Sequence, residues 1–479
     1  MMNIRIKNIG IIKDSIIELN GLTVITGENG TGKTTIGKTL FSLISATENL
    51  NESALEHKKI YTMNILRRIL EECGIYEFRS GQSYEFNDFA YEEQKSFIQM
   101  VLLNDYSKLK SLNDIISFIN NFYNELEELK ENELPKWNNI NRKVRYYNSK
   151  QLWENFKLNK NKFLCKLIEL KQTLTKDDSL VSYANAKILN TLNMEFFSQI
   201  GPINNSNLKS EIVIDNGTIK NYEVSIKKGE IEDKSSFNLN AFNNCLLIDD
   251  INVINDMNLF HISKERMNRA SRIYYDIDNF IEMTKAYSKK DNHRDYLLSG
   301  LTKKVNEYEQ SVYKEKTNDI LNLIKKAFDD NVAFIDGKYL CEGNKLDIRN
   351  LASGSKLFLI LKLLLERGLL DDKSLLILDE PENHLHPGWI NLLVEVIVLM
   401  QKYLNVTILL TTHSPNLLLA IDTISKKYRL KEKFNPYVAI SEDNGNYVNF
   451  KNIKENIEEA FAHLIRPYLE MDALRDSIQ

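Results

Sequence analysis

The chain has 479 residues, of which 43% are hydrophobic and 27% are charged, and its formal net charge is −4. These values are typical of a soluble globular protein with one large domain or two to three smaller ones, and they exclude a global basic excess for nucleic-acid binding. The four cysteines are far apart, which favours reduced core thiols over a zinc site or a disulfide framework. No apolar run reaches membrane-spanning length and the first residues form no signal-peptide core, so we expect a cytoplasmic protein without a membrane partner.

The first 45 residues predict three short strands, a loop and a helix. Apolar runs at 4–9, 16–19 and 22–26 have strand character. The third run continues directly into Gly-Glu-Asn-Gly-Thr-Gly-Lys-Thr-Thr at residues 27–35, and a helical pattern follows. A glycine, four residues and then Gly-Lys-Thr, between a strand and a helix, is the phosphate-loop pattern.

Such a loop binds phosphate because its glycines let backbone N–H groups converge on the oxygens at the positive end of the helix. We therefore predict an ATP site, with Lys33 at the β- and γ-phosphates and the Thr34 hydroxyl on Mg²⁺. A flexible glycine-rich turn is the alternative explanation. The predicted nucleotide-binding residues of the loop are Asn29, Gly30, Thr31, Gly32, Lys33, Thr34 and Thr35.

The middle of the chain predicts insertions of two kinds. Residues 51–190 are rich in Lys, Glu, Asn and Leu and repeat apolar residues at helical spacing, which indicates a helical insertion. Residues 191–260 return to strand character, with a hairpin signal at Asn216-Gly217. Helical patterns resume over 261–330.

A serine and a glycine open the next apolar helix, which begins at Ser353-Gly354 and reaches Glu366. The free N–H groups at such a helix start can bind an anion. An ordinary serine N-cap explains the same residues, so both interpretations are left open.

The strand that follows ends in two acids. Leu375–Leu378 is an apolar run without polar alternation, which is typical of a strand buried on both faces of a parallel sheet. Parallel sheets bind their ligands at the carboxyl ends of the strands. We therefore predict that Asp379 faces Mg²⁺ and that Glu380 orients and deprotonates a water molecule. A core strand that ends in a polar loop is the alternative.

A second buried strand at 405–411 ends in Thr412-His413-Ser414-Pro415. A histidine at a strand end is more often structural than catalytic, unless other site residues share that edge of the sheet. Since Asp379 and Glu380 share it, His413 is a candidate for the site.

The order of these motifs resembles the ABC-type ATPases of the SMC/RecF-like branch. More narrowly, Asp-Glu-Pro-Glu-Asn-His-Leu-His-Pro at 379–387 and Thr-Thr-His-Ser-Pro at 411–415 look like the OLD-related ATPases of bacterial phage-defence operons. The ATPase subunits of Septu, PARIS and lactococcal abortive-infection systems are examples. The resemblance covers residues 1–50 and roughly 340–425. It implies ATP hydrolysis with Mg²⁺ by a head-to-tail homodimer, whose nucleotide state controls a separate effector such as a nuclease or a toxin.

The resemblance also implies roles for individual residues. Ser353 and Gly354 would contact the γ-phosphate of ATP held by a second subunit, although Ser355-Lys356 stands where the transporter-type signature has Gly-Gln. His413 would be the switch histidine near the γ-phosphate. The family also has a glutamine that contacts Mg²⁺ and water, and Gln199 is the candidate for it. Asn383 and His384 would lie in the loop that crosses the dimer interface.

Two other functions are left open. A DNA-repair ATPase of the RecF kind would bind DNA. A self-contained OLD-type nuclease would carry a metal-binding nuclease domain after the ATPase, but the segment after His413 contains no Asp-x-Asp or His-Asn-His pattern. We therefore expect any nuclease to be a separate chain.

The expected fold is α/β: a phosphate-loop ABC-type ATPase head with a mostly parallel sheet, a β-rich flank and helical insertions. The expected segments are 1–50 (head, with the phosphate loop), 51–190 (helical insertion), 191–260 (β-rich lobe), 261–330 (helical), 331–425 (head, with Ser353, Asp379 and His413) and 426–479 (strands and an amphipathic helix).

Overall fold

The structure is a computed structural model that describes most of the chain. The described residues are 2–55, 149–175, 180–203, 208–217, 220–232, 236–237, 242–261, 292–303, 307–335, 338–343, 345–383 and 385–478, with some residues between 58 and 124. The chain forms two compact units, which are unit 1 (Met1–Glu48, Val181–Arg266 and Lys289–Gln479) and unit 2 (Asn49–Leu180 and Met267–Ser288). Helix α6 (Ser149–Thr175) belongs to unit 2. The six segments expected from the sequence stay a prediction.

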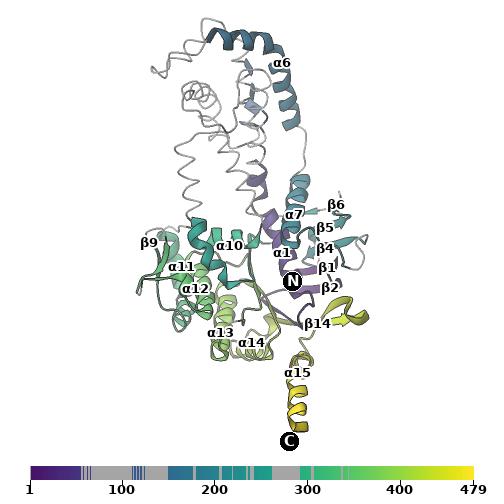
Figure 1. Ribbon diagram of the computed structural model, residues 1–479, viewed down its shortest axis with the longest axis vertical. Coiled ribbons are helices and arrows are strands. Elements are labelled where there is room, and N and C mark those ends of the chain that lie inside the picture. Colours follow the sequence, from purple (N-terminus) through teal and green to yellow (C-terminus); the bar gives the residue numbers. More distant parts are fainter. Residues whose placement is uncertain are drawn as a thin grey trace. The chain divides into compact units, whose positions relative to one another are not determined.

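Unit 1 is built around one 12-stranded sheet with the order β6-β5-β4-β1-β2-β15-β14-β3-β13-β12-β8, and β7 pairs with β5. Figure 1 labels β6, β5, β4, β1 and β2 at one end of this sheet. Its strands are β1 (Met2–Ile9), β2 (Ile12–Leu19), β3 (Leu22–Thr26), β4 (Ser210–Asp215), β5 (Lys220–Lys227), β6 (Glu230–Ile231), β7 (Ser236–Phe237), β8 (Asn244–Ile248), β12 (Ser374–Asp379), β13 (Thr407–Thr412), β14 (Phe434–Glu442) and β15 (Tyr447–Asn452). A separate sheet contains β9 (Val332–Ile335), β10 (Lys338–Cys341) and β11 (Leu346–Asp347).

The two halves of the large sheet differ in strand direction. Strands β14, β3, β13, β12 and β8 follow one another in parallel. Strands β1, β2, β4, β5, β6 and β7 pair antiparallel with one another and form the flank, and β4 and β5 are the hairpin predicted around Gly217. Strand β15 joins the two groups, since it pairs antiparallel with β14 and parallel with β2. The expected α/β fold is confirmed, with the motif-bearing strands in the parallel half.

Helices cover the parallel half on both faces. The described helices of this part of the chain are α1 (Lys33–Thr47), α7 (Leu180–Phe196), α10 (His293–Leu301), α11 (Glu307–Ile324), α12 (Ser353–Glu366), α13 (Pro387–Leu404), α14 (Pro415–Lys427) and α15 (Ile457–Ile478), with short 3₁₀ helices η4 (Ile251–Asp256), η5 (Ile348–Asn350), η6 (Lys431–Lys433) and η7 (Asp443–Gly445). Leu376 and Leu378 pack into the core with α11 to α14, whereas Leu375 and Ile377 pack into the core with α1. This alternation is the two-residue period of a strand buried on both faces.

The start of α12 differs from one of the two interpretations left open. Its N-cap residue is Ala352, and no side chain caps the helix there, so Ser353 is the first helical residue and not the cap. Among the helices of the described residues, none is long and apolar enough to cross a membrane.

Candidate nucleotide and magnesium site

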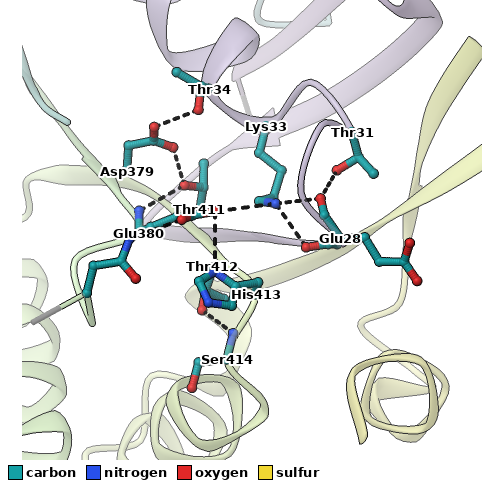
Figure 2. A network of polar contacts seen from close by, with 12 residues as sticks. Glu28, Thr31, Lys33, Thr34, Asp379, Glu380, Thr411, Thr412, His413 and Ser414 are labelled. Carbon is teal, nitrogen blue, oxygen red and sulfur yellow. Dashed lines mark hydrogen bonds and ion pairs between the residues drawn. The ribbon is translucent and has the colours of Figure 1, made fainter. Parts of the chain in front are cut away.

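Four parallel strands bring the predicted motifs to one edge of the sheet. Strand β13 lies between β3 and β12, and Thr411 is in register with Ile25 on one side and Asp379 on the other. The phosphate loop leaves β3 at this edge, and His413 follows β13 at the same edge (Figure 2). The sheet therefore converts motifs that are hundreds of residues apart into neighbours.

The phosphate loop has the backbone geometry of an anion-binding nest. Gly30 and Gly32 both have φ near +79°, a left-handed conformation that side chains disfavour. A Cβ atom on Gly32 would also lie 2.9 Å from Cγ2 of Ile11. None of the hydrogen bonds found among the described residues uses the backbone N–H groups of Asn29 to Gly32. These groups sit at the N-terminus of the 15-residue helix α1, where they favour a phosphate.

Lys33 lies across the mouth of this loop. Its side chain is 5% exposed, and Nζ donates to the carbonyl oxygens of Gly27 at 2.9 Å and Glu28 at 2.8 Å (Figure 2). Nζ also lies 3.5 Å from Oε1 of Glu380. The charge is thus held over the loop and next to the carboxylate that was predicted to act on water.

Thr34 and Asp379 form the pair that fits Mg²⁺. The Thr34 hydroxyl donates to Oδ2 of Asp379 at 2.6 Å, and the Thr411 hydroxyl donates to Oδ1. Burial raises the pKa of Asp379 and the charges of Glu380 and Asp249 add to this, while the two hydroxyl bonds oppose it. A hydroxyl and a carboxylate are hard oxygen ligands, and Mg²⁺ is commonly held by one or two carboxylates together with phosphates and water. The residues therefore fit the predicted ion.

Glu380 is held in a strained position by three partners. Its φ of 48° lies in the left-handed region, which costs on the order of 1–3 kcal/mol and is found mainly at functional sites. Nδ2 of Asn383 donates to Oε2 at 3.1 Å, and Nδ1 of His413 lies 3.3 Å from Oε1. Burial alone would raise the pKa of Glu380, but Asn383, His413 and Lys33 outweigh it and lower the pKa. Glu380 is therefore an anion aimed at the site.

His413 joins the site as an accessible group with carboxylates around it. Its side chain is 43% exposed and lies between Glu380 and Glu382. Glu382 is a buried residue that the sequence did not single out. It accepts a hydrogen bond from Thr412, and burial raises the pKa of its carboxyl group.

Three other predicted residues lie apart from this cluster. Ser353 begins α12, and Gly354 packs so closely that a Cβ atom there would lie 3.0 Å from the Trp389 ring. Gln199 is exposed in the turn after α7. No hydrogen bond or ion pair of the described residues joins Ser353, Gly354 or the Gln199 side chain to Lys33 or Asp379. Their roles stay predictions, and His384 lies outside the described residues.

The sequence missed the acids at the end of β8. Ile248 is in register with Leu378, so Asp249 follows beside Asp379. Asp249 and Asp250 line a cavity of about 70 Å³ together with Asp379, Glu380 and Asn383. A strand of two leucines and an isoleucine that runs into two acids was the available signal, since it repeats the pattern of Leu375–Glu380.

Comparison with known proteins gives one family match. A family model described as "AAA domain, putative AbiEii toxin, Type IV TA system" matches residues 219–420, a segment that includes Asp379, Glu380 and His413 but not the phosphate loop. No curated protein matches the chain.

Solved structures similar to the chain include heads of Smc proteins. One is the Smc head domain with an extended coiled coil bound to the C-terminal domain of ScpA from Pyrococcus furiosus, at 8% identity and a TM-score of 0.37, covering 97% of this chain and 100% of that one. Another is the Smc head domain with a coiled coil and joint from Pyrococcus yayanosii, at 9% identity and a TM-score of 0.33, covering 98% and 100%.

Proposed function

We propose that the protein is a magnesium-dependent ATPase of the SMC/RecF-like kind. The observation that carries this proposal is the meeting of the phosphate loop with Asp379 and Glu380 across the sheet, through the 2.6 Å bond of Thr34 and the 3.5 Å approach of Lys33. A phosphate loop alone would support nucleotide binding. A metal ligand, Asp379, and an anionic base, Glu380, that contact residues of the same loop support hydrolysis as well.

In this mechanism the chain mainly positions groups and neutralises charge, as in other phosphoryl transfers. The loop N–H groups and Lys33 bind the phosphates, and Lys33 exchanges its bonds to Gly27 and Glu28 for bonds to the nucleotide. Thr34 and Asp379 would hold Mg²⁺, which would neutralise charge that develops on the phosphate oxygens. Glu380 accepts a hydrogen bond from the attacking water and takes its proton, while His413 lies beside it.

The first experiment tests this activity directly. Equilibrium binding of a fluorescent ATP analogue and release of phosphate are measured for wild type, Lys33→Ala and Lys7→Ala. Lys7 is the matched control, because it lies on β1 and pairs with the exposed Glu211. We expect Lys33→Ala to lose binding and hydrolysis and Lys7→Ala to retain both. Equal binding by the two variants would contradict the assigned role of Lys33.

We further propose that Ser353 completes the site of a second copy in a head-to-tail dimer. The uncapped N-terminus of α12 supports this, because its N–H groups have no capping side chain. If so, Lys33→Ala and Ser353→Arg subunits rescue each other: a mixed dimer has one site with both lesions and one intact site. Random pairing makes half of the dimers mixed, so about a quarter of wild-type hydrolysis returns when the sites act independently. No rescue despite proven subunit exchange would argue for sites built within one chain.

For the biological role we propose a nucleotide-controlled regulator of a separate effector in anti-phage defence. The resemblance of 379–387 and 411–415 to defence ATPases supports it, as does the toxin–antitoxin description of the matching family model. Purification of the tagged protein from its host, with and without phage, tests it: a nuclease or toxin that co-purifies is expected. Hydrolysis stimulated by duplex DNA, through salt-dependent binding, would instead favour the RecF-like alternative.

A further inference from the structure

A chain of three ionisable residues, of which Glu195 and His293 are buried and Asp249 is partly exposed, ends at the nucleotide site. His293 is the first residue of α10, and its Nδ1 lies 2.7 Å from Oε2 of Glu195, near the end of α7. The backbone N–H of His293 donates to the other Glu195 oxygen at 2.8 Å. On its far side, Nε2 of His293 lies 2.9 Å from Oδ1 of Asp249. One ring is therefore hydrogen-bonded to Glu195 and lies within ion-pair distance of Asp249.

The histidine carries a positive charge in this environment. Burial alone would lower its pKa, but Asp249 and Glu195 outweigh burial and raise the pKa of His293 to about 9. Nε of Arg294 lies 3.6 Å from Asp249, and Lys38 adds positive potential there. The ring edge of His293 packs on Phe41 of α1, with 6.0 Å between centroids.

Desolvation offsets part of the attraction within a buried charged pair, so such a pair is often no more stabilising than apolar residues in its place. Apolar side chains of similar size would often stabilise the fold as well. The charged contact between His293 and Asp249 is therefore better explained by the side chain that it positions than by the stability that it adds.

The side chain that His293 positions is Asp249. This residue follows Ile248, which pairs with Leu378, so Asp249 lies beside Asp379 at the edge of the sheet. Both line the same cavity as Glu380, and the charge of Asp249 contributes to the raised pKa of Asp379. The position of the Asp249 carboxylate thus sets part of the field on the residue proposed to hold Mg²⁺.

His293 and Glu195, which contact Asp249 directly and through His293, lie on two helices that follow the segments of unit 2 in the chain. Helix α7 begins at Leu180, where the first segment of unit 2 ends. Helix α10 begins shortly after the second segment of unit 2, Met267–Ser288. Glu195 and His293 therefore lie on the two helices through which the chain returns from unit 2.

We propose that Asp249 is a positioning residue of the nucleotide site and that His293, fixed by Glu195, holds its carboxylate in place. A shift of α7 or α10 then moves Asp249 against Asp379, and a ligand at Asp379 restrains both helices in return. The three contacts thus join α7 and α10 to the site within unit 1. The inference deepens the proposed ATPase function and rests on it.

The experiment compares Asp249→Asn, His293→Gln and their double mutant with Tyr296→Phe. Tyr296 is the matched control because it lies on α10 and its ring also packs on Phe41, but its hydroxyl donates to Glu48 and not toward the site. We expect either single mutant to lower kcat about tenfold to hundredfold, with the Kd for ATP within about threefold of wild type. The double mutant should lose no more than either one, because both changes break the same link.

Hydrogen exchange gives a readout besides activity. ATP with Mg²⁺ should slow exchange at the last turn of α7 and the first turn of α10 in wild type and in Tyr296→Phe, but not in His293→Gln. Thermal unfolding checks that each variant is folded. If His293→Gln does not fold, Glu195→Gln replaces it, since it keeps an acceptor for the His293 N–H and weakens the charged contact.

Three results would overturn the inference: wild-type kcat in a folded His293→Gln, an equal loss in Tyr296→Phe, or losses that multiply in the double mutant. Each can occur while wild type still binds and hydrolyses ATP, which leaves the proposed function intact. A wild-type protein that binds no ATP would instead refute the proposed function, and this inference with it.

Discussion

Replacement of Glu380 by glutamine separates nucleotide binding from hydrolysis. The carboxylate accepts from Asn383 at 3.1 Å through one oxygen and faces Lys33 at 3.5 Å and His413 at 3.3 Å through the other. Glutamine keeps the size and one acceptor. Its NH₂ group must then point either at the Asn383 amide or at Nζ of Lys33 and Nδ1 of His413, so the contacts on one of these two sides are lost.

The magnitude follows from these contacts. An amide cannot take the proton of water, and the loss of a general base lowers rates by about 10²–10⁴-fold. Binding should change little, because the loop N–H groups do not touch Glu380. The change even releases Lys33 from a carboxylate whose gross attraction at such a distance is about 4 kcal/mol near a protein surface, so ATP affinity should stay constant or rise.

Single-turnover hydrolysis and equilibrium ATP binding, both with Mg²⁺, measure the two quantities. Glu395→Gln is the control, since that glutamate pairs with Lys427 on α14, away from the loop. Wild-type hydrolysis by Glu380→Gln would show that Glu380 is not the base. Loss of ATP binding with intact folding would refute the view that the carboxylate is separate from the phosphate contacts.

Three further outcomes are expected. Thr34→Val should weaken ATP binding about tenfold or more with Mg²⁺ but not in EDTA, because it removes the hydroxyl proposed to bind the metal. Ser45→Ala is the control on the same helix, since the Ser45 hydroxyl donates to the carbonyl oxygen of Phe41. It should change the ATP affinity neither with Mg²⁺ nor in EDTA. Gly354→Ala should lower the free energy of unfolding by about 1–3 kcal/mol in urea titrations, because its Cβ would lie 3.0 Å from Trp389; unchanged stability would contradict this packing. The pKa of His293 is raised from 6.5 to about 9. The charged histidine therefore stabilises the fold fully below pH 6.5, and this stabilisation is lost as the pH rises through 9. The free energy of unfolding should fall by on the order of 3 kcal/mol between pH 7 and 10 in wild type and not in His293→Gln.

The sequence was sufficient where one local pattern contained both the fold and the chemistry. The phosphate loop is a continuous stretch that lies between strand β3 and helix α1 as predicted, and its Thr34 contacts Asp379. Leu375–Glu380 is also continuous, and four buried residues before two acids define both a central strand and its polar end. In such stretches the position along the chain fixes the position at the sheet edge.

Elsewhere the site depends on pairings that no short pattern contains. Asp249 reaches Asp379 because β8 pairs with β12, more than a hundred residues later in the chain. His293 reaches Asp249 only after the chain has passed through unit 2. By resemblance Gln199 was predicted to contact Mg²⁺ and water; it lies in an exposed turn, and this role stays a prediction. Asp249, which no motif singled out, lines the cavity beside Asp379.

The charges at the sheet edge explain why these pieces belong to one site. Asp249, Asp379 and Glu380 are three of the four acids that line one small cavity, and close carboxylates raise each other's pKa unless positive charge lies near. Two of them have such a charge: Glu380 lies beside Lys33, and Asp249 lies beside His293. Asp379 accepts hydrogen bonds from the hydroxyls of Thr34 and Thr411, no basic side chain among the described residues forms an ion pair with it, and it is the one of the three whose pKa is raised. A cation bound at Asp379 would therefore offset a carboxylate that has no positive side chain beside it, which is a physical reason to expect a metal at the proposed site.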